Sequence, residues 1–91
     1  MAVFWSASAR EDLEYLHVFL ATVDRDAADE VASTLVAGVR RLARQRRLGV
    51  RLPEFEPREV RRLFVGDYEV RYELTERDLF VLRIWHQREA R

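Results

Sequence analysis

The feature that most constrains the fold is a strict alternation of apolar and charged residues that follows a turn signal. The turn is the tight pair Gly66-Asp67, and the apolar positions after it are Tyr68, Val70, Tyr72 and Leu74. Alternation with a period of two places one set of side chains on each face of a strand. Together with a strand predicted at 60–65, this pattern predicts a β-hairpin with one buried face.

The start of the chain predicts a strand followed by a helix. The apolar stretch at 2–5 is β-prone and ends at Ser6. Apolar residues then recur at helical spacing, so that a helix is expected over about residues 7–21. Its N-terminus fits a capping box of Ser8 and Glu11, and Ser6 is the competing N-cap.

A second helix is predicted after a polar turn. Asp24 or Asp26 can accept hydrogen bonds from its first N–H groups, and Gly49 fits its end. The segment 52–57 holds two prolines, which exclude a helix interior. This segment is therefore expected to be a connector on the surface.

The last apolar run, at 79–85, is apolar on both faces, as is typical of a strand inside a sheet. The predicted order is thus β-α-α-β-β-β. Two helices of this length can cover one face of a sheet made of the first strand and a three-stranded meander. We expect an α+β fold with two N-terminal helices on a mainly antiparallel four-stranded sheet, in a single domain over residues 1–91.

The composition limits the available chemistry. The 91 residues include no Cys, which excludes disulfides, thiol nucleophiles and Cys-based zinc sites. His17 and His86 show no metal-ligand spacing, and the three isolated glycines form no phosphate-binding loop, so neither metal nor cofactor is expected. No apolar run approaches the roughly 18 residues of a membrane span, and no processing signal is visible. A soluble, cytoplasmic protein is expected.

Charge is balanced overall but uneven along the chain. All 16 basic residues are arginines, and nine of them lie in residues 40–62 with three Glu, whereas residues 1–39 hold two Arg and seven Asp or Glu. Four arginines would share one helical face if the second helix extended that far: Arg40, Arg44, Arg47 and Arg51. The basic segment is either a solvated face or a surface for acidic partners, while the acidic first third opposes nucleic-acid binding.

The end of the last predicted strand combines a charge, a large aromatic ring and a titratable ring. The residues are Arg83, Trp85, His86 and Arg88. Functional sites favour such strand ends. The alternative is that Trp85 caps the core while His86 and Arg88 are only exposed.

Several short motifs occur in the order of these elements. They are Phe4-Trp5-Ser6, Asp12-Leu13, Ala27-Ala28, Arg62-Leu63-Phe64-Val65, Asp67-Tyr68-x-Val70-x-Tyr72 and Val81-Leu82-Arg83-Ile84-x-His86. Their joint order and spacing resemble the RelE/ParE superfamily of bacterial type II toxins over essentially the whole chain. The resemblance implies one of two activities. RelE-like toxins cut messenger RNA in the ribosome, whereas ParE-like toxins block DNA gyrase by binding.

The residues favour the ParE-like class. RelE-like proteins hold two cations on the second strand, an arginine after the first hairpin tyrosine and another near the end of the last strand, where they stabilise phosphorane charge. The matching positions here are Val60, Arg62, Glu69 and Gln87, so that one cation is missing and another is replaced by a carboxylate. If the chain is a ribonuclease instead, the resemblance implies Arg62, Arg83 and His86 as catalytic residues.

The ParE-like interpretation implies a non-catalytic toxin of the plasmid-stabilisation kind. Its target is expected to be DNA gyrase, contacted by Arg83, Trp85, His86 and Arg88. Its other partner is a cognate antitoxin, a ribbon-helix-helix dimer whose flexible tail wraps the toxin. The expected antitoxin contacts are Tyr15, Phe19, Val36, Arg40, Arg44, Arg47, Phe55 and Phe64, unless the apolar ones are ordinary core. A relative that keeps the fold and has lost toxicity is the third alternative.

Overall fold

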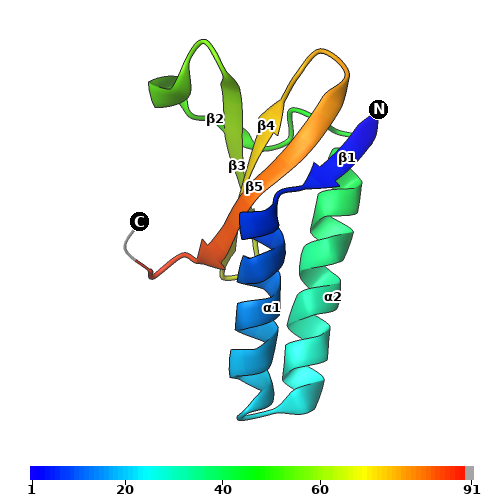
Figure 1. The fold of residues 1–91 in the computed structure, drawn as a ribbon, viewed down its shortest axis with the longest axis vertical. Coiled ribbons are helices and arrows are strands. Elements are labelled where there is room, and N and C mark those ends of the chain that lie inside the picture. Colours follow the sequence, from blue (N-terminus) through cyan, green and yellow to red (C-terminus); the bar gives the residue numbers. More distant parts are fainter. Residues whose placement is uncertain (90–91) are drawn as a thin grey trace.

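The computed structural model describes residues 1–89, and it confirms the predicted α+β order. Its elements are β1 (Ala2–Trp5), α1 (Ala7–Ala21), α2 (Arg25–Leu42), β2 (Val50–Arg51), the 3-10 turn η1 (Pro53–Phe55), β3 (Glu59–Val65), β4 (Tyr68–Leu74) and β5 (Asp78–His86). The sheet order is β1-β5-β4-β3-β2, in which β1 runs parallel to β5 and the other pairs are antiparallel. β2 adds a fifth, two-residue strand that the sequence pattern did not predict (Figure 1).

Side-chain caps fix where both helices begin. The hydroxyl of Ser6 accepts a hydrogen bond from the Ala9 N–H at 2.9 Å and donates to the Leu82 carbonyl at 2.8 Å. Ser6 is therefore the N-cap of α1, and Ser8 lies inside the helix, so that the predicted capping box of Ser8 and Glu11 is wrong. Ser6 prevails because it also ties the start of α1 to β5. Of the two candidates for α2, Asp24 is the N-cap.

α2 ends earlier than the sequence suggested. It ends at Leu42 with Ala43 as its C-cap, and not near Gly49. The fully buried Tyr72 explains the early end, because its hydroxyl donates to the Arg46 carbonyl at 2.8 Å and accepts from the Gly49 N–H at 2.9 Å. These bonds hold residues 46–49 against the sheet.

The four arginines therefore do not share a helical face, because the helix does not extend as far as that face required. Arg40 and Arg44 lie at the end of α2 and just beyond it, but Arg47 and Arg51 fall outside the helix, and Arg51 belongs to β2. Helical spacing alone could not show where the helix stops, since the cause is a hydrogen bond to a residue far along the chain.

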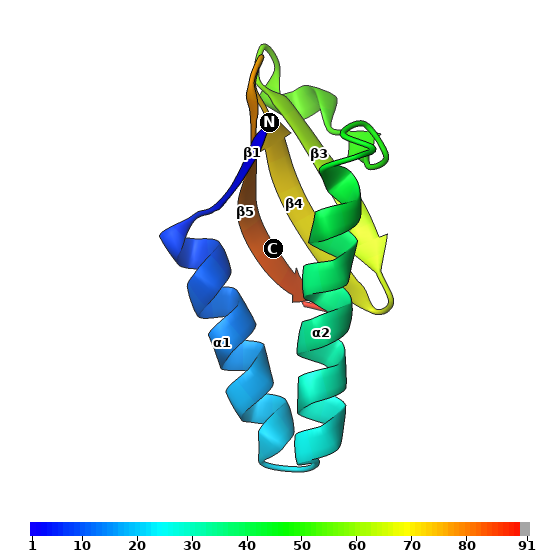
Figure 2. The same cartoon turned by 90° about the vertical axis from the view of Figure 1, so that its right-hand side faces the viewer.

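The core lies between the two helices and one face of the sheet (Figure 2). Its buried members are Ala9, Leu16, Leu35, Val39, Leu42, Val70, Tyr72, Leu74, Leu79, Val81 and Ile84. The alternation in β4 thus has the predicted outcome, with one face turned to the helices. The helical hairpin also projects past the sheet, so that its far end has no strand beside it (Figure 1). Large apolar side chains on that part of α1 remain exposed.

Candidate functional site

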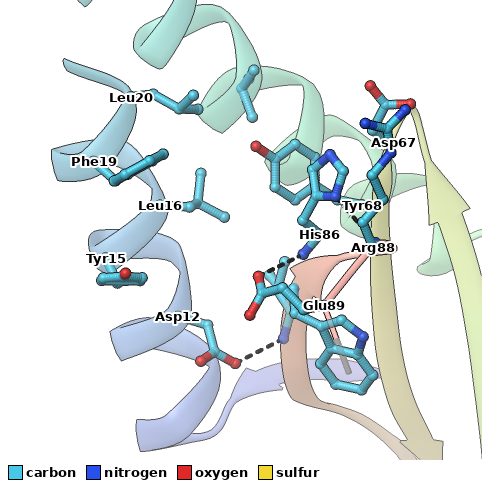
Figure 3. A pocket seen from close by; sticks show the side chains of 13 residues that line it. Asp12, Tyr15, Leu16, Phe19, Leu20, Asp67, Tyr68, His86, Arg88 and Glu89 are labelled. Carbon is cyan, nitrogen blue, oxygen red and sulfur yellow. Dashed lines mark hydrogen bonds between the residues drawn. The ribbon is translucent and has the colours of Figure 1, made fainter. Parts of the chain in front are cut away.

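A groove of about 810 Å³ opens between α1 and the adjoining ends of β4 and β5. Leu16, Phe19 and Leu20 of α1 face Tyr68 and His86 across it (Figure 3). The groove exists because the helical hairpin continues past the strands. The strands cover only the end of the hairpin that lies away from the turn between α1 and α2 (Figure 1). A concave surface with this apolar lining suits the side chains of an amphipathic helix.

Two aromatic rings on α1 stand at the rim of this groove. Tyr15 is 69% exposed and Phe19 is 60% exposed, and their ring centroids lie 6.4 Å apart, as expected for residues one turn apart. Exposed rings at a concave apolar surface indicate a protein-binding site. These two predicted antitoxin contacts are brought together by the structure, and neither belongs to the core.

The sheet side of the groove is formed by Tyr68 and His86. The two residues are Cα partners across β4 and β5, and their rings meet edge to face at 5.3 Å. Burial raises the pKa of Tyr68, and the charges of Asp67 and Glu89 raise it further, so that its hydroxyl stays protonated. The Arg88 N–H donates to Nδ1 of His86 at 3.1 Å, so that a neutral His86 ring carries its proton on Nε2.

Asp12 joins α1 to β5 at the closed end of the groove. Its carboxylate accepts from Nε and Nη2 of Arg83 at 2.8 and 3.1 Å and from the Ile84 N–H at 2.9 Å. The hydrogen bonds to this carboxylate raise the pKa of Arg83 above its ordinary value. β1 pairs with β5 only as far as Val81, so Asp12 supplies the acceptor that the β5 edge lacks beyond that point. No pattern in the sequence indicated this role of Asp12.

Replacing Asp12 with alanine is expected to destabilise the fold by about 2 kcal/mol, because the Ile84 N–H loses its acceptor and Arg83 its counter-ion. Urea unfolding of the purified variant measures this loss. The matched control is Glu11→Ala, which removes an exposed carboxylate one residue away. Equal stability of the two variants would contradict the role given to Asp12.

The predicted target residues lie at or next to the groove. Trp85, His86 and Arg88 line it, and Arg83 is bonded to Asp12, which lines it as well. Trp85 is only 6% exposed, and the guanidinium carbon of Arg71 lies 4.7 Å from its ring centroid. The structure therefore brings the predicted target residues to one groove, but Trp85 is nearly buried there and Arg83 is held in an ion pair.

The predicted antitoxin contacts beyond Tyr15 and Phe19 are dispersed. Val36 is half-buried on α2, and Arg40 and Arg44 are exposed. Phe55 and Phe64 lie with Arg71 and Arg62, respectively, on the face of the sheet turned away from the helices. That face is assigned by alternation, because the residues flanking Arg71 in β4 belong to the core.

Arg47 forms an ion pair within the chain. Its Nε and Nη2 donate to Glu59 at 2.9 and 3.1 Å, and Nε of Arg61 donates to the same carboxylate at 2.9 Å. The bond from Arg47 is the main cause that lowers the pKa of Glu59 below its ordinary value of 4.5. Arg47, in the segment that follows α2, therefore links that segment to β3 through Glu59.

This ion pair predicts a pH dependence of stability. A carboxyl group whose pKa is lower in the folded state stabilises the fold above pH 4.5, and that stabilisation is lost as the pH falls through the folded-state pKa. We expect the unfolding free energy of Glu59→Gln to fall less steeply than that of the unmodified protein between about pH 4.5 and 3. Urea unfolding across this range measures both slopes, and parallel curves would refute the expectation.

The three residues of the ribonuclease alternative are not brought together. Arg62 lies on the face away from the helices, because its neighbour Leu63 packs against the core. His86 lies with Tyr68 on the helix side, and Arg83 is paired with Asp12. The β4 strand separates Arg62 from both other residues. Arg62, Arg83 and His86 therefore do not face a common point.

Two further findings concern membrane spans and metal ligands in residues 1–89. Within this range no helix has the length and apolar character needed to cross a membrane. In the same residues, no three His, Asp or Glu side chains are grouped as metal ligands.

Comparison with known proteins identifies the family. A search of curated proteins finds no match. Among solved structures, the chain is similar to one from the chromosomal ParDE toxin–antitoxin system of P. aeruginosa, with a TM-score of 0.79 and 20% identity over 94% of this chain and 95% of that chain. That likeness shows a shared fold. Residues 3–91 match the model of the ParE toxin of the type II toxin–antitoxin system parDE, and because this match spans nearly the whole sequence, the chain belongs to the ParE toxin family.

Proposed function

We propose that this chain is a toxin that inhibits DNA gyrase by binding and that a cognate antitoxin neutralises it. The observation that carries the proposal is the match to the ParE toxin model over residues 3–91. Such a pair stabilises a plasmid or chromosomal segment that encodes it, and both partners would act in the bacterial cytoplasm. The mechanism is association rather than bond cleavage.

The arrangement of charged residues supports binding over RNA cleavage. Attack by a ribose 2′-hydroxyl requires a base, an acid and cations around one phosphate. Arg62 and His86 instead lie on opposite faces of the sheet, and the position after the first hairpin tyrosine is Glu69, which is 7% exposed and bonded to Arg71. A carboxylate there would repel a phosphate. We therefore prefer the gyrase-binding function to the ribonuclease.

The groove supports a helical antitoxin segment as the neutralising element. The exposed rings of Tyr15 and Phe19 and the half-buried Leu20 provide an apolar surface that a helix of the antitoxin tail would cover. Arg40 and Arg44 are exposed and form no ion pair within residues 1–89, so that they can attract acidic residues of the same tail. Val36 lies on the same helix. A ribbon-helix-helix dimer remains the expected form of the antitoxin.

Induced expression in a bacterial host tests this function. We expect growth arrest with a DNA-damage response, because a gyrase held on DNA leaves breaks, while messenger RNA stays intact by primer extension. Co-expression of the antitoxin should restore growth. Codon-linked cleavage of messengers without DNA damage would favour the ribonuclease, and growth without arrest would favour a relative that has lost toxicity.

A further inference from the structure

The face of β3, β4 and β5 turned away from the helices, here called the outer face, carries stacked arginine and aromatic side chains. The guanidinium carbon of Arg71 lies 4.7 Å from the ring centroid of Trp85 and 5.5 Å from that of Phe55. The guanidinium carbon of Arg62 lies 5.4 Å from the ring centroid of Phe64. A guanidinium stacked on a ring keeps its N–H edge available for a planar acceptor.

The charges on this face are unevenly compensated. Arg62 and Arg71 are direct partners across β3 and β4, and Arg83 is the partner of Arg71 on β5. Like charges placed directly opposite each other destabilise a sheet. Asp12 pairs with Arg83 and Glu69 pairs with Arg71, but no carboxylate within residues 1–89 pairs with Arg62. Arg62 therefore carries an uncompensated charge beside a second cation.

Arg62 and Arg71 also have hydrogen-bond donors that lack an acceptor in the part of the chain that the structure describes. The Nε atoms of Arg62 and Arg71 are buried and donate to no acceptor in residues 1–89. Buried donors without acceptors and opposed like charges both lower stability. Departures from pairing rules of this kind are concentrated at sites that serve a function.

The ligand that fits the outer face is a peptide with a carboxylate next to an apolar side chain. A carboxylate can accept two parallel N–H bonds from the uncompensated guanidinium of Arg62. Phe64, which is 48% exposed and lies beside it, provides an apolar contact. A phosphate backbone fits less well, because it offers several successive charges, whereas Arg71 and Arg83 on this face are already paired with carboxylates. The net charge of zero also gives no general attraction to a polyanion.

We propose that the outer face, centred on Arg62 and Phe64, binds an extended acidic segment of the target protein. This inference rests on the proposed function, since it takes gyrase as the target. Arg62 and Phe64 lie on β3 and are not part of the groove lining, so that substitutions at these two positions should separate target binding from antitoxin binding. Trp85 lies beneath Arg71, whose guanidinium carbon is 4.7 Å from its ring centroid.

Binding assays with purified full-length variants test the proposal. Fluorescently labelled toxin is titrated with the purified gyrase A and B subunits, with the antitoxin, and with a labelled single-stranded RNA of random sequence. We expect Arg62→Gln and Phe64→Ser each to weaken gyrase binding at least about tenfold. The gyrase affinity of Arg62→Lys should lie between those of the unmodified toxin and Arg62→Gln, because lysine keeps the charge and loses the planar donors. Arg10→Gln, an exposed arginine of α1, serves as the matched control.

The outcomes separate this inference from the function on which it rests. Weakened gyrase binding with unchanged antitoxin affinity and an unchanged thermal unfolding midpoint supports the proposal. Unmodified toxin that binds gyrase equally well after either substitution overturns the proposal and leaves the proposed function intact. Unmodified toxin that does not bind gyrase overturns both. If Arg62→Gln weakens binding of the RNA, or weakens binding of the antitoxin and not of gyrase, the outer face binds another ligand. That result also overturns the proposal.

Discussion

Replacing Phe19 with aspartate is expected to lower the affinity of the toxin for its antitoxin by about 100-fold or more. Phe19 is 60% exposed at the groove, so that its ring is available to a partner and contributes little to the core. A carboxylate in its place removes the apolar contact and must be desolvated when the groove is covered. Isothermal titration calorimetry with the purified antitoxin measures the change.

The control for this experiment is Val23→Asp. Val23 is 84% exposed in the turn between the two helices and is not part of the groove lining. Both substitutions add a carboxylate to an exposed apolar position of the helical hairpin, and both are expected to change stability by less than about 0.5 kcal/mol. Antitoxin affinity that differs by less than threefold between the two variants would show that the groove is not the antitoxin site.

Replacing Gly49 with alanine is expected to destabilise the fold by about 3 kcal/mol. A Cβ atom at this position would lie 2.6 Å from the Arg62 carbonyl oxygen and 2.8 Å from the ring and hydroxyl of Tyr72. The carbonyl belongs to a paired strand and cannot rotate away, so that the backbone of residue 49 must move. That movement also breaks the bond from its N–H to the buried Tyr72 hydroxyl.

Gly38→Ala is the matched comparison. Its Cβ would approach Cγ2 of Val65 at 2.8 Å, but this atom is the end of a half-buried side chain that can change rotamer. Alanine also favours the helix that contains residue 38 by about 1 kcal/mol over glycine. We expect a small net effect, within about 1 kcal/mol. Urea unfolding compares the two variants, and equal losses would contradict the assignment of the Gly49 contact.

Local patterns were sufficient to predict most of the fold. The alternation that begins at Tyr68 and the helical spacing of the first half both depend on neighbours in the chain, and the structure confirms them. The resemblance to the RelE/ParE superfamily is likewise confirmed. The end of α2 and the strand β2 were not predictable in this way, because both depend on contacts to Tyr72 and β3 that are distant in sequence.

The site was less predictable than the fold. Tyr15 and Phe19 were expected as antitoxin contacts because the resemblance implies a partner that packs on the helices, and the structure puts both at the groove. The roles of Asp12 and Arg71 were missed. Each depends on which strand or helix lies beside it, as Asp12 accepts from the β5 edge and Arg71 stacks on Trp85. No spacing within the sequence encodes such a partner.

The most direct test of the proposed function is the supercoiling of relaxed plasmid DNA by purified gyrase as the toxin is titrated, beside a ribosome-programmed messenger-cleavage assay with the same preparation. We predict that supercoiling falls as toxin approaches the enzyme concentration, that antitoxin restores it, and that the messenger stays intact. Codon-linked messenger cleavage with unaffected supercoiling would contradict gyrase as the target and would mean that Arg62, Arg83 and His86 act together despite their separation here.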